Sequence, residues 1–256
     1  MSLSVEQHNI EILENREFWD KKPLLRKVYA QFYREIASKL NPAVPGQIVE
    51  LGSGIGNIKE HIPQAITTDI FPNPWLDRVE NAYHLSFGRG EVGHLILFDV
   101  WHHLKYPGTA LEEFARVLAP GGRIIVFDPA MGLIGRIVFG YFHHEPLGLK
   151  DEIAWNAPDD SAGLETEYYA AQGNASRVFG NKGFKDELRM WRVVDVEYFS
   201  GLAYVGSGGF RGPQLYPGAL LPLFGRIDSV LSRFPKLASR MLVVLEQKGD
   251  CEPPGA

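Results

Sequence analysis

The residues best suited to chemistry lie in one short segment, from Ile48 to Gly56. An apolar run ends there in a carboxylate, Glu50, and passes directly into the alternating glycines Gly52, Gly54 and Gly56. Glycine lets the backbone approach a ligand closely and take a positive φ without a Cβ clash. A carboxylate beside the glycines repels a pyrophosphate but attracts an ammonium or a sulfonium group. The segment therefore predicts a binding turn for a cationic ligand.

Two further carboxylates stand at the ends of apolar runs. Asp69 lies at the end of the expected strand 65–70, and Asp99 lies at the end of the expected strand that begins at Leu95. In open parallel α/β sheets, ligands lie beyond the carboxyl ends of the strands, where a strand-end carboxylate binds ribose hydroxyls. We therefore expect both carboxylates to share one edge of a sheet with the glycine turn.

Histidines supply the candidate general bases. His102 and His103 follow the strand end at Asp99, and each can either remove a proton from a substrate or brace a loop. His143 lies later in the chain, close to Glu145, where it can remove a proton or bind a metal, but no third ligand stands at a suitable spacing. The candidates for the base are thus His103, His102 and His143, and no metal site is expected.

Strand-like runs alternate with helical segments between residues 46 and 128. Strands are expected over 47–51, 65–70, a short run before residue 85, 95–100 and 123–128, with helices after the glycine turn and over 109–118. This alternation predicts a parallel sheet with crossover helices. Farther along, the sequence predicts a helix over about 175–190, a strand over 193–205, a helix over 220–234 and a final strand over 240–247.

The flanking segments complete the expected domain organisation. Residues 5–40 have mixed helical spacing of aromatic and aliphatic residues, so we expect 1–45 to form an N-terminal helical cap on a main domain over 46–250. Residues 130–175 are rich in glycine, proline and aromatics and are expected to form an inserted lid. Residues 251–256 are expected to be a disordered tail.

Composition excludes several classes of function. The 256 residues carry a net charge of −5 without a basic stripe, which argues against nucleic acid as a partner. Cys251 is the single cysteine, which excludes a disulfide within the chain and fits a reducing compartment. The N-terminus lacks the pattern of a signal peptide, and no run approaches the ~18 apolar residues of a membrane span. A cytoplasmic protein without a transmembrane segment is expected.

The motifs occur in a recognisable order. The glycine turn and Asp69 are followed by Asn81-Ala82, by Asp99-Val-Trp-His-His-Leu and by Arg116-Val-Leu-Ala-Pro-Gly-Gly. Over about residues 46–128 this set resembles the class I S-adenosylmethionine-dependent methyltransferases, in particular small-molecule methyltransferases of the methyltransferase-11 type. The resemblance implies a Rossmann-like, doubly wound, mostly parallel sheet with an antiparallel last strand. It also implies S-adenosylmethionine as the methyl donor, S-adenosylhomocysteine as the product and a small-molecule acceptor.

The resemblance also implies how the cofactor is held. Glu50 and the glycine backbone would hold its methionine part, and Asp69 its ribose. Asn81-Ala82 would contact the adenine and Asp99-Val100 the methyl side. The implied set of cofactor contacts is Glu50, Gly52, Ser53, Gly54, Gly56, Asp69, Ile70, Asn81, Ala82, Asp99 and Val100. The sequence departs from the family where Phe71-Pro-Asn-Pro-Trp75 replaces a helix, and where Asn81 stands in place of a common aspartate.

The acceptor remains open between a carbohydrate, a lipid-linked molecule and a natural product, methylated at oxygen, nitrogen or carbon. One alternative is an NAD(P)-dependent oxidoreductase, which favours Gly-x-Gly-x-x-Gly, whereas Asn57 occupies the last position here. Another is a catalytically silent protein that only binds the cofactor. A homodimer is compatible with all of these.

Overall fold

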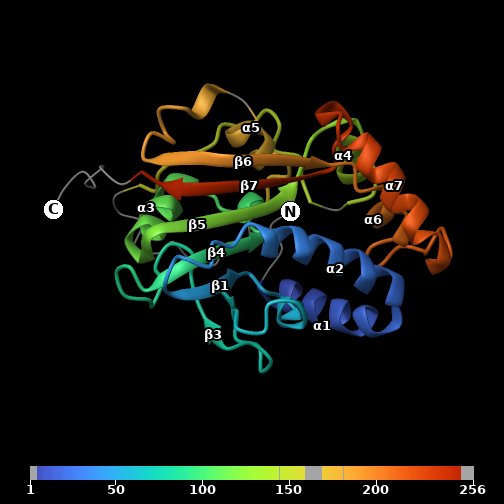
Figure 1. Cartoon of the computed structure of the whole chain (residues 1–256), viewed down its shortest axis with the longest axis horizontal. Helices are drawn as coiled ribbons and strands as arrows, with labels where there is room; N and C mark the ends of the chain where they lie inside the picture. Colours follow the sequence, from blue (N-terminus) through green and yellow to red (C-terminus); the bar gives the residue numbers. More distant parts are fainter. Residues whose placement is uncertain (1–4, 144, 159–168, 181, 249–256) are drawn as a thin grey trace.

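The structure is a computed structural model that describes residues 5–143, 145–158, 169–180 and 182–248. Its centre is a seven-stranded sheet in the order β3-β2-β1-β4-β5-β7-β6 (Figure 1). The strands are β1 (Gln47–Leu51), β2 (Ile66–Asp69), β3 (Arg78–Val79), β4 (Val92–Phe98), β5 (Leu118–Pro129), β6 (Trp191–Phe199) and β7 (Arg240–Gln247). Neighbouring strands are parallel except at β7, which runs antiparallel to both β5 and β6. The predicted Rossmann-like sheet with an antiparallel last strand is confirmed.

Helices cover both faces of the sheet (Figure 1). They are α1 (Val5–Lys21), α2 (Pro23–Ser38), α3 (Pro107–Val117), α4 (Leu133–Tyr141), α5 (Asn174–Phe179), α6 (Leu202–Ser207) and α7 (Leu221–Leu231). Short 3₁₀ turns are η1 (Asn57–Glu60), η2 (Trp101–His103), η3 (Lys182–Phe184), η4 (Gly218–Leu220) and η5 (Pro235–Leu237).

Alternation along the central strands creates two separate cores. Leu95 and Leu97 of β4 face α3 and α5, whereas Ile96 and Phe98 face α2 and α6. Successive side chains of a strand point to opposite faces, so strands buried on both faces become continuously apolar. Every residue of β4 is buried, which fixes the position of its carboxyl end.

The expected N-terminal helix is two helices rather than one. It breaks at Lys22, before Pro23, because proline has no N–H to donate and its ring restricts the preceding residue. The buried side chains of α2, among them Tyr29, Phe32 and Tyr33, pack against the sheet in the second core. Helix α2 is therefore a layer of the sheet domain, and its Tyr29 and Tyr33 also line the cavity at the edge of the sheet.

Three later expectations need correction. The helix after the glycine turn is only the 3₁₀ turn η1, because the short segment reaches Pro63 after little more than one turn. The helix expected over 175–190 ends at Phe179, where Gly180 follows as its C-cap. The strand expected over 193–205 ends at Phe199, and Gly201, with φ of 71°, turns the chain into α6.

The segment expected to be a lid, residues 130–175, contains the helix α4. Of the described residues in this segment, Leu147 forms a single bridge with Gln172. Residues 159–168 of the expected lid and the expected tail 251–256 lie outside the described residues. No helix among the described residues is long and apolar enough to cross a membrane.

Candidate active site

A cavity of about 700 Å³ opens at the carboxyl ends of β1, β2 and β4. Sequence segments far apart meet there because parallel strands end at the same edge of the sheet. Of the eleven residues that the resemblance implies for cofactor binding, all but Gly56 line this cavity. Gly56 instead precedes η1 with φ of 72°.

The glycine turn has the geometry that its residues predict. Gly52 has φ of 64°, and a Cβ there would lie 2.5 Å from Cγ2 of Val100, so the turn packs directly against the loop after β4. Gly54 has φ of 51°, and a Cβ there would have no described atom within 4 Å. Gly52 is thus needed for close packing and for its backbone conformation, whereas Gly54 is needed for its conformation alone.

Glu50 is buried at the cavity wall, with 1% of its surface exposed. Its Oε1 accepts a hydrogen bond of 3.2 Å from the Tyr33 hydroxyl, but its buried Oε2 has no hydrogen-bond partner among the described residues. Burial, together with the charge of Asp69, raises the pKa of Glu50 to about 7. A cationic or hydrogen-bonding ligand in the cavity would satisfy this carboxylate.

Asp69 connects β2 to the glycine turn. Its Oδ2 accepts a 3.1 Å hydrogen bond from the backbone N–H of Gly54, and its side chain lines the cavity. The segment Phe71–Trp75 forms a loop that supports the same turn, because Nε1 of Trp75 donates a 2.8 Å hydrogen bond to the carbonyl of Gly54. The missing helix is thus replaced by a loop that holds the binding turn.

Asn81 and Ala82 lie on the same wall, next to the buried carboxylate of Glu80. Oδ1 of Asn81 accepts a 3.0 Å hydrogen bond from the backbone N–H of Tyr83, which is the turn-forming role that asparagine often has. Asn81 therefore has a structural task in addition to any contact with a ligand.

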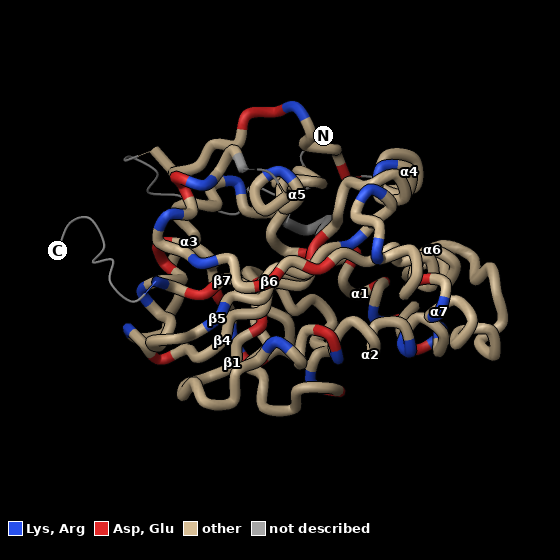
Figure 2. The backbone as a smooth tube through the Cα atoms, turned by 45° about the horizontal axis from the view of Figure 1, so that its top comes forward, with Lys and Arg blue, Asp and Glu red and all other residues tan. Residues whose placement is uncertain are grey.

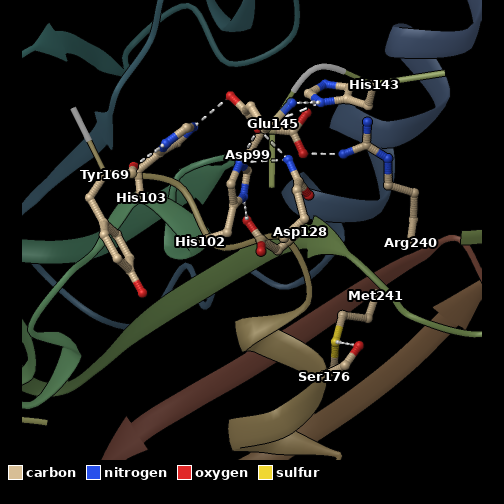
Figure 3. Close-up of polar contacts among 11 residues, drawn as sticks. Asp99, His102, His103, Asp128, His143, Glu145, Tyr169, Ser176, Arg240 and Met241 are labelled. Carbon is tan, nitrogen blue, oxygen red and sulfur yellow. Dashed lines mark hydrogen bonds and ion pairs between the residues drawn. The ribbon is translucent and has the colours of Figure 1, made fainter. Parts of the chain in front are cut away.

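Asp99 stands at the cavity wall with an unusual backbone. Its φ is 56°, the only positive value among the described residues other than glycine. Its side chain pairs with Nη1 of Arg240 (Figure 3). Arg240 is itself buried, and its guanidinium lies over the ring of Tyr204. Burial alone would lower the pKa of Arg240, but the Asp99 charge raises it above its usual value. Arg240 thereby stabilises a strained strand end.

His102 and His103 separate into different roles. His103 lines the cavity, and its Nδ1 lies 2.9 Å from the backbone carbonyl of Tyr169. His102 is not part of the cavity lining; its Nδ1 lies 2.9 Å from Oδ1 of the buried Asp128 (Figure 3). Burial alone would lower the pKa of His102, but the carboxylates of Asp128 and Glu145 raise it to about 10.

Glu145 lies close to all three candidate histidines. Its oxygens lie 3.4 Å from Nε2 of His102, 3.8 Å from Nε2 of His103 and 3.7 Å from Nδ1 of His143. Burial alone would raise the pKa of Glu145, but the hydrogen bond from His102 and the histidine charges lower it well below its usual value. His143 is not among the residues that line the cavity.

The ligand atoms of His102, His103 and Glu145 lie within 4.8 Å of one another. Two imidazoles and a carboxylate are a donor set that zinc accepts. The spacing of these residues in the sequence did not predict that they would meet. The amide Nε2 of Gln172 donates to Glu145, whose Oε2 also lies 3.4 Å from Nε2 of the protonated His102. We interpret the cluster as a hydrogen-bonded network that this amide closes.

The rest of the cavity wall is aromatic. Tyr29 stacks on Phe98 with ring centroids 5.3 Å apart, and Phe210 lies 5.6 Å from Tyr29. All three line the cavity. The cavity therefore has an acidic part beside the glycine turn and an apolar part that suits an uncharged organic group.

Several residues with clear roles were not identified from the sequence. Arg240, Asp128 and Gln172 come from segments remote from the motifs, and only tertiary contact reveals them. Asp128 could have been identified from the sequence, because it ends the predicted fifth strand at the ligand-binding edge. Tyr33 and Trp75 look like ordinary core aromatics in the sequence.

The comparisons with known proteins agree with this geometry. Residues 49–126 match the methyltransferase domain family. No curated protein sequence matches the chain. A structure from Thermotoga maritima, described as a possible histamine N-methyltransferase, has a TM-score of 0.52 at 13% identity, covering 93% of this chain and 99% of that chain. An S-adenosylmethionine-dependent methyltransferase from Archaeoglobus fulgidus has a TM-score of 0.52 at 11% identity, covering 87% and 94%.

A third similar structure is geranyl diphosphate C-methyltransferase from Streptomyces coelicolor, in complex with S-adenosylhomocysteine. It has a TM-score of 0.52 at 10% identity and covers 85% of this chain and 76% of that chain. At these identities the structural likeness shows the fold alone, so the family match at residues 49–126 carries the assignment. Residues 49–126 therefore belong to the methyltransferase domain family, and they lie within a Rossmann-like sheet.

Proposed function

We propose that this methyltransferase methylates a hydroxyl group of a small-molecule acceptor, with His103 as the general base. The observation that supports this most directly is the orientation of His103 at the cavity wall. The carbonyl of Tyr169 can only accept a hydrogen bond, so Nδ1 of His103 carries the proton and Nε2 is the basic nitrogen. Of the three candidate bases, His103 alone belongs to the cavity lining.

The cofactor fits the acidic part of the cavity on the evidence of Glu50. Glu50 lines the cavity, and its buried Oε2 has no hydrogen-bond partner among the described residues, so a cationic ligand there would compensate its charge. We assign the methionine part of the cofactor to Glu50 and the glycine turn, its ribose to Asp69, its adenine to the wall at Asn81 and its methyl side to Asp99. When bound, the cofactor supplies an electrophilic methyl group on a sulfonium.

His103 would remove the acceptor proton as the oxygen attacks. The proton moves to Nε2, and Glu145, 3.8 Å from this nitrogen, faces the imidazolium that forms. His102 and Gln172 hold Glu145 in place. The aromatic wall at Tyr29 and Phe210 would orient the acceptor and exclude water, which methyl transfer requires for alignment. Residues 130–175 are proposed to cover the acceptor, since Pro158 and Tyr169 already line the cavity.

The Asp69→Ala variant is expected to bind S-adenosylhomocysteine roughly tenfold more weakly than the wild type, without unfolding. A hydrogen bond to a charged group contributes about 1.5–3 kcal/mol, and about 1.4 kcal/mol is tenfold in affinity. Calorimetry with S-adenosylhomocysteine measures the change, and circular dichroism checks the fold. Unchanged affinity in a folded variant would reduce Asp69 to a residue that only holds the glycine turn through Gly54.

The His103→Gln variant is expected to lose about a hundredfold or more in turnover, the usual contribution of a general base. Transfer of a radiolabelled methyl group to pooled cell metabolites and lipid extract identifies an acceptor and then gives the rate. The variant should keep wild-type affinity for S-adenosylhomocysteine within a few-fold. His84→Gln, at an exposed position, is the control and should leave turnover unchanged.

Two results would contradict this proposal. Full turnover by His103→Gln would show that His103 is not the general base, although methyl transfer itself would stand. No transfer to any fraction, above the level of heat-inactivated protein, would instead favour the catalytically silent cofactor-binding protein.

A further inference from the structure

Exposed apolar side chains are concentrated on two segments of the molecule. Nine of the fifteen large exposed hydrophobic residues among the described residues lie within 133–142 and 220–234. They are Leu133, Ile137, Tyr141, Phe142, Leu220, Leu223, Ile227, Val230 and Phe234. Single exposed apolar residues are normal on a soluble protein, but a cluster of this kind marks an interaction surface.

The two segments are neighbours in space. Helices α4 and α7 lie at the same end of the molecule (Figure 1). The 3₁₀ turn η5, which follows α7, packs against α4, where the N–H of Gly135 donates a 3.2 Å hydrogen bond to the carbonyl of Ala238. We call these nine exposed hydrophobic residues the apolar face.

Positive charge accompanies the apolar face although the whole chain has a net charge of −5. Arg136 lies on α4 and Arg226 on α7, Arg233 and Lys236 follow α7, and all four are exposed. Figure 2 shows Lys and Arg positions along both helices. Asp228 is the one acidic residue of α7, and its carboxylate points inward, accepting hydrogen bonds of 2.7 and 2.9 Å from the N–H groups of Leu202 and Ala203. The face therefore combines apolar side chains with exposed basic ones.

We propose that the apolar face docks the protein onto an anionic lipid membrane surface. Helices that lie in the plane of a membrane combine apolar side chains with Lys and Arg, and binding grows with buried apolar area and with attraction to anionic lipids. The basic residues favour a lipid surface over a second copy of this chain, because two copies would bring the same arginines and Lys236 together. Exposed aromatic residues such as Tyr141 and Phe142 suit the membrane–water interface.

The apolar face backs directly onto the active site. Phe139, on the buried side of α4, packs against the guanidinium of Arg240, which pairs with Asp99 at the cavity wall. Helix α6, which packs against α7, carries Tyr204, whose ring centroid lies 4.9 Å from the same guanidinium. Docking would place the cavity close to the lipid surface, so the acceptor would be a lipid-linked molecule. This last step rests on the proposed function; docking itself does not.

The test is sedimentation of the full-length protein with vesicles, without cofactor or acceptor. Vesicles of phosphatidylcholine alone are compared with an equal mixture of phosphatidylcholine and phosphatidylglycerol. The wild type is expected to sediment with the mixed vesicles and to dissociate as salt is raised. The Tyr141→Ser/Phe142→Ser double variant should lose at least about tenfold in partitioning, because it removes buried apolar area. Arg226→Gln/Arg233→Gln should lose roughly tenfold and much of the salt dependence.

Val193→Ser/Val194→Ser is the matched control, because it removes two exposed apolar residues from β6, outside the apolar face. It should partition like the wild type. Calorimetry with S-adenosylhomocysteine confirms that each variant is folded. Absence of the wild type from mixed vesicles, or equal partitioning by all variants, would overturn the proposal. A dimer in sedimentation velocity that Tyr141→Ser/Phe142→Ser dissolves, without vesicle binding, would assign the face to a second copy.

Discussion

The Glu50→Gln variant is expected to be more stable than the wild type at pH 8 and yet to bind the cofactor more weakly. Glu50 is buried beside Asp69, and its pKa in the folded protein is about 7 instead of 4.5. A charged Glu50 is therefore unfavourable in the ligand-free protein, and it becomes useful only when a cation enters the cavity. The same carboxylate thus works against folding and in favour of binding.

The sign of the pH dependence follows from proton binding. Between pH 4.5 and about 7 the folded protein holds the Glu50 proton more tightly than the unfolded chain does, so the free energy of unfolding falls as the pH rises. A rise in pKa from 4.5 to about 7 corresponds to roughly 3 kcal/mol. This penalty is absent below pH 4.5 and complete above pH 7. Glutamine does not ionise, so the variant lacks the penalty.

Urea unfolding of both proteins at pH 5 and pH 8 measures this effect. The stability of Glu50→Gln relative to the wild type should increase by about 2–3 kcal/mol from pH 5 to pH 8. At pH 8 the variant should bind S-adenosylmethionine at least about tenfold more weakly, as the loss of a charge-assisted contact predicts. Glu17→Gln, on the exposed face of α1, is the control. A relative stability that does not change with pH would show that Glu50 titrates as it does in the unfolded chain.

The Arg240→Met variant is expected to lose about 2–3 kcal/mol of stability. Removing one partner of a buried ion pair costs up to about 3–5 kcal/mol, because the other charge stays buried without compensation. Arg240 is almost fully buried, but the Asp99 side chain is 32% exposed to the cavity, which moderates the loss.

A double-mutant cycle separates the ion pair from simple packing. In an Asp99→Asn background, Arg240→Met should cost at least about 1 kcal/mol less, because no charge is left unpaired. Asparagine tolerates the left-handed backbone at position 99, so this background should fold. Chemical unfolding of the four proteins gives the coupling energy. Additive losses would mean that Arg240 stabilises the protein by packing alone, against Phe139 and Tyr204.

The sequence predicted which strand-end residues meet at the cavity wall beside the glycine turn. Glu50, Asp69 and Asp99 each end a buried strand, and parallel strands end at one edge, so their convergence follows from topology. The pattern over 240–247 predicted β7, and the resemblance implied its antiparallel direction. The helix ends were predicted less well. The helix expected to reach residue 190 stops at Gly180, and Pro23 divides the N-terminal helix, where short-range backbone effects outweigh apolar periodicity.

The acceptor half could not be predicted in the same way. Glu145 reaches His102 and His103 across more than 40 positions, and no periodic pattern encodes that contact. Arg240 begins a strand that pairs between β5 and β6, so its approach to Asp99 depends on the order of strands in the sheet. The apolar face is likewise invisible in the sequence, because α4 and α7 look like ordinary amphipathic helices until their exposed sides are known.

Calorimetry of the purified protein with S-adenosylhomocysteine and with NAD tests the central claim most directly. The acidic wall at Glu50 and the replacement of the last dinucleotide-binding glycine by Asn57 predict one S-adenosylhomocysteine site per chain and no heat signal with NAD. Asp69→Ala should weaken the S-adenosylhomocysteine signal in the same experiment. Tight binding of NAD with no response to S-adenosylhomocysteine would contradict the account.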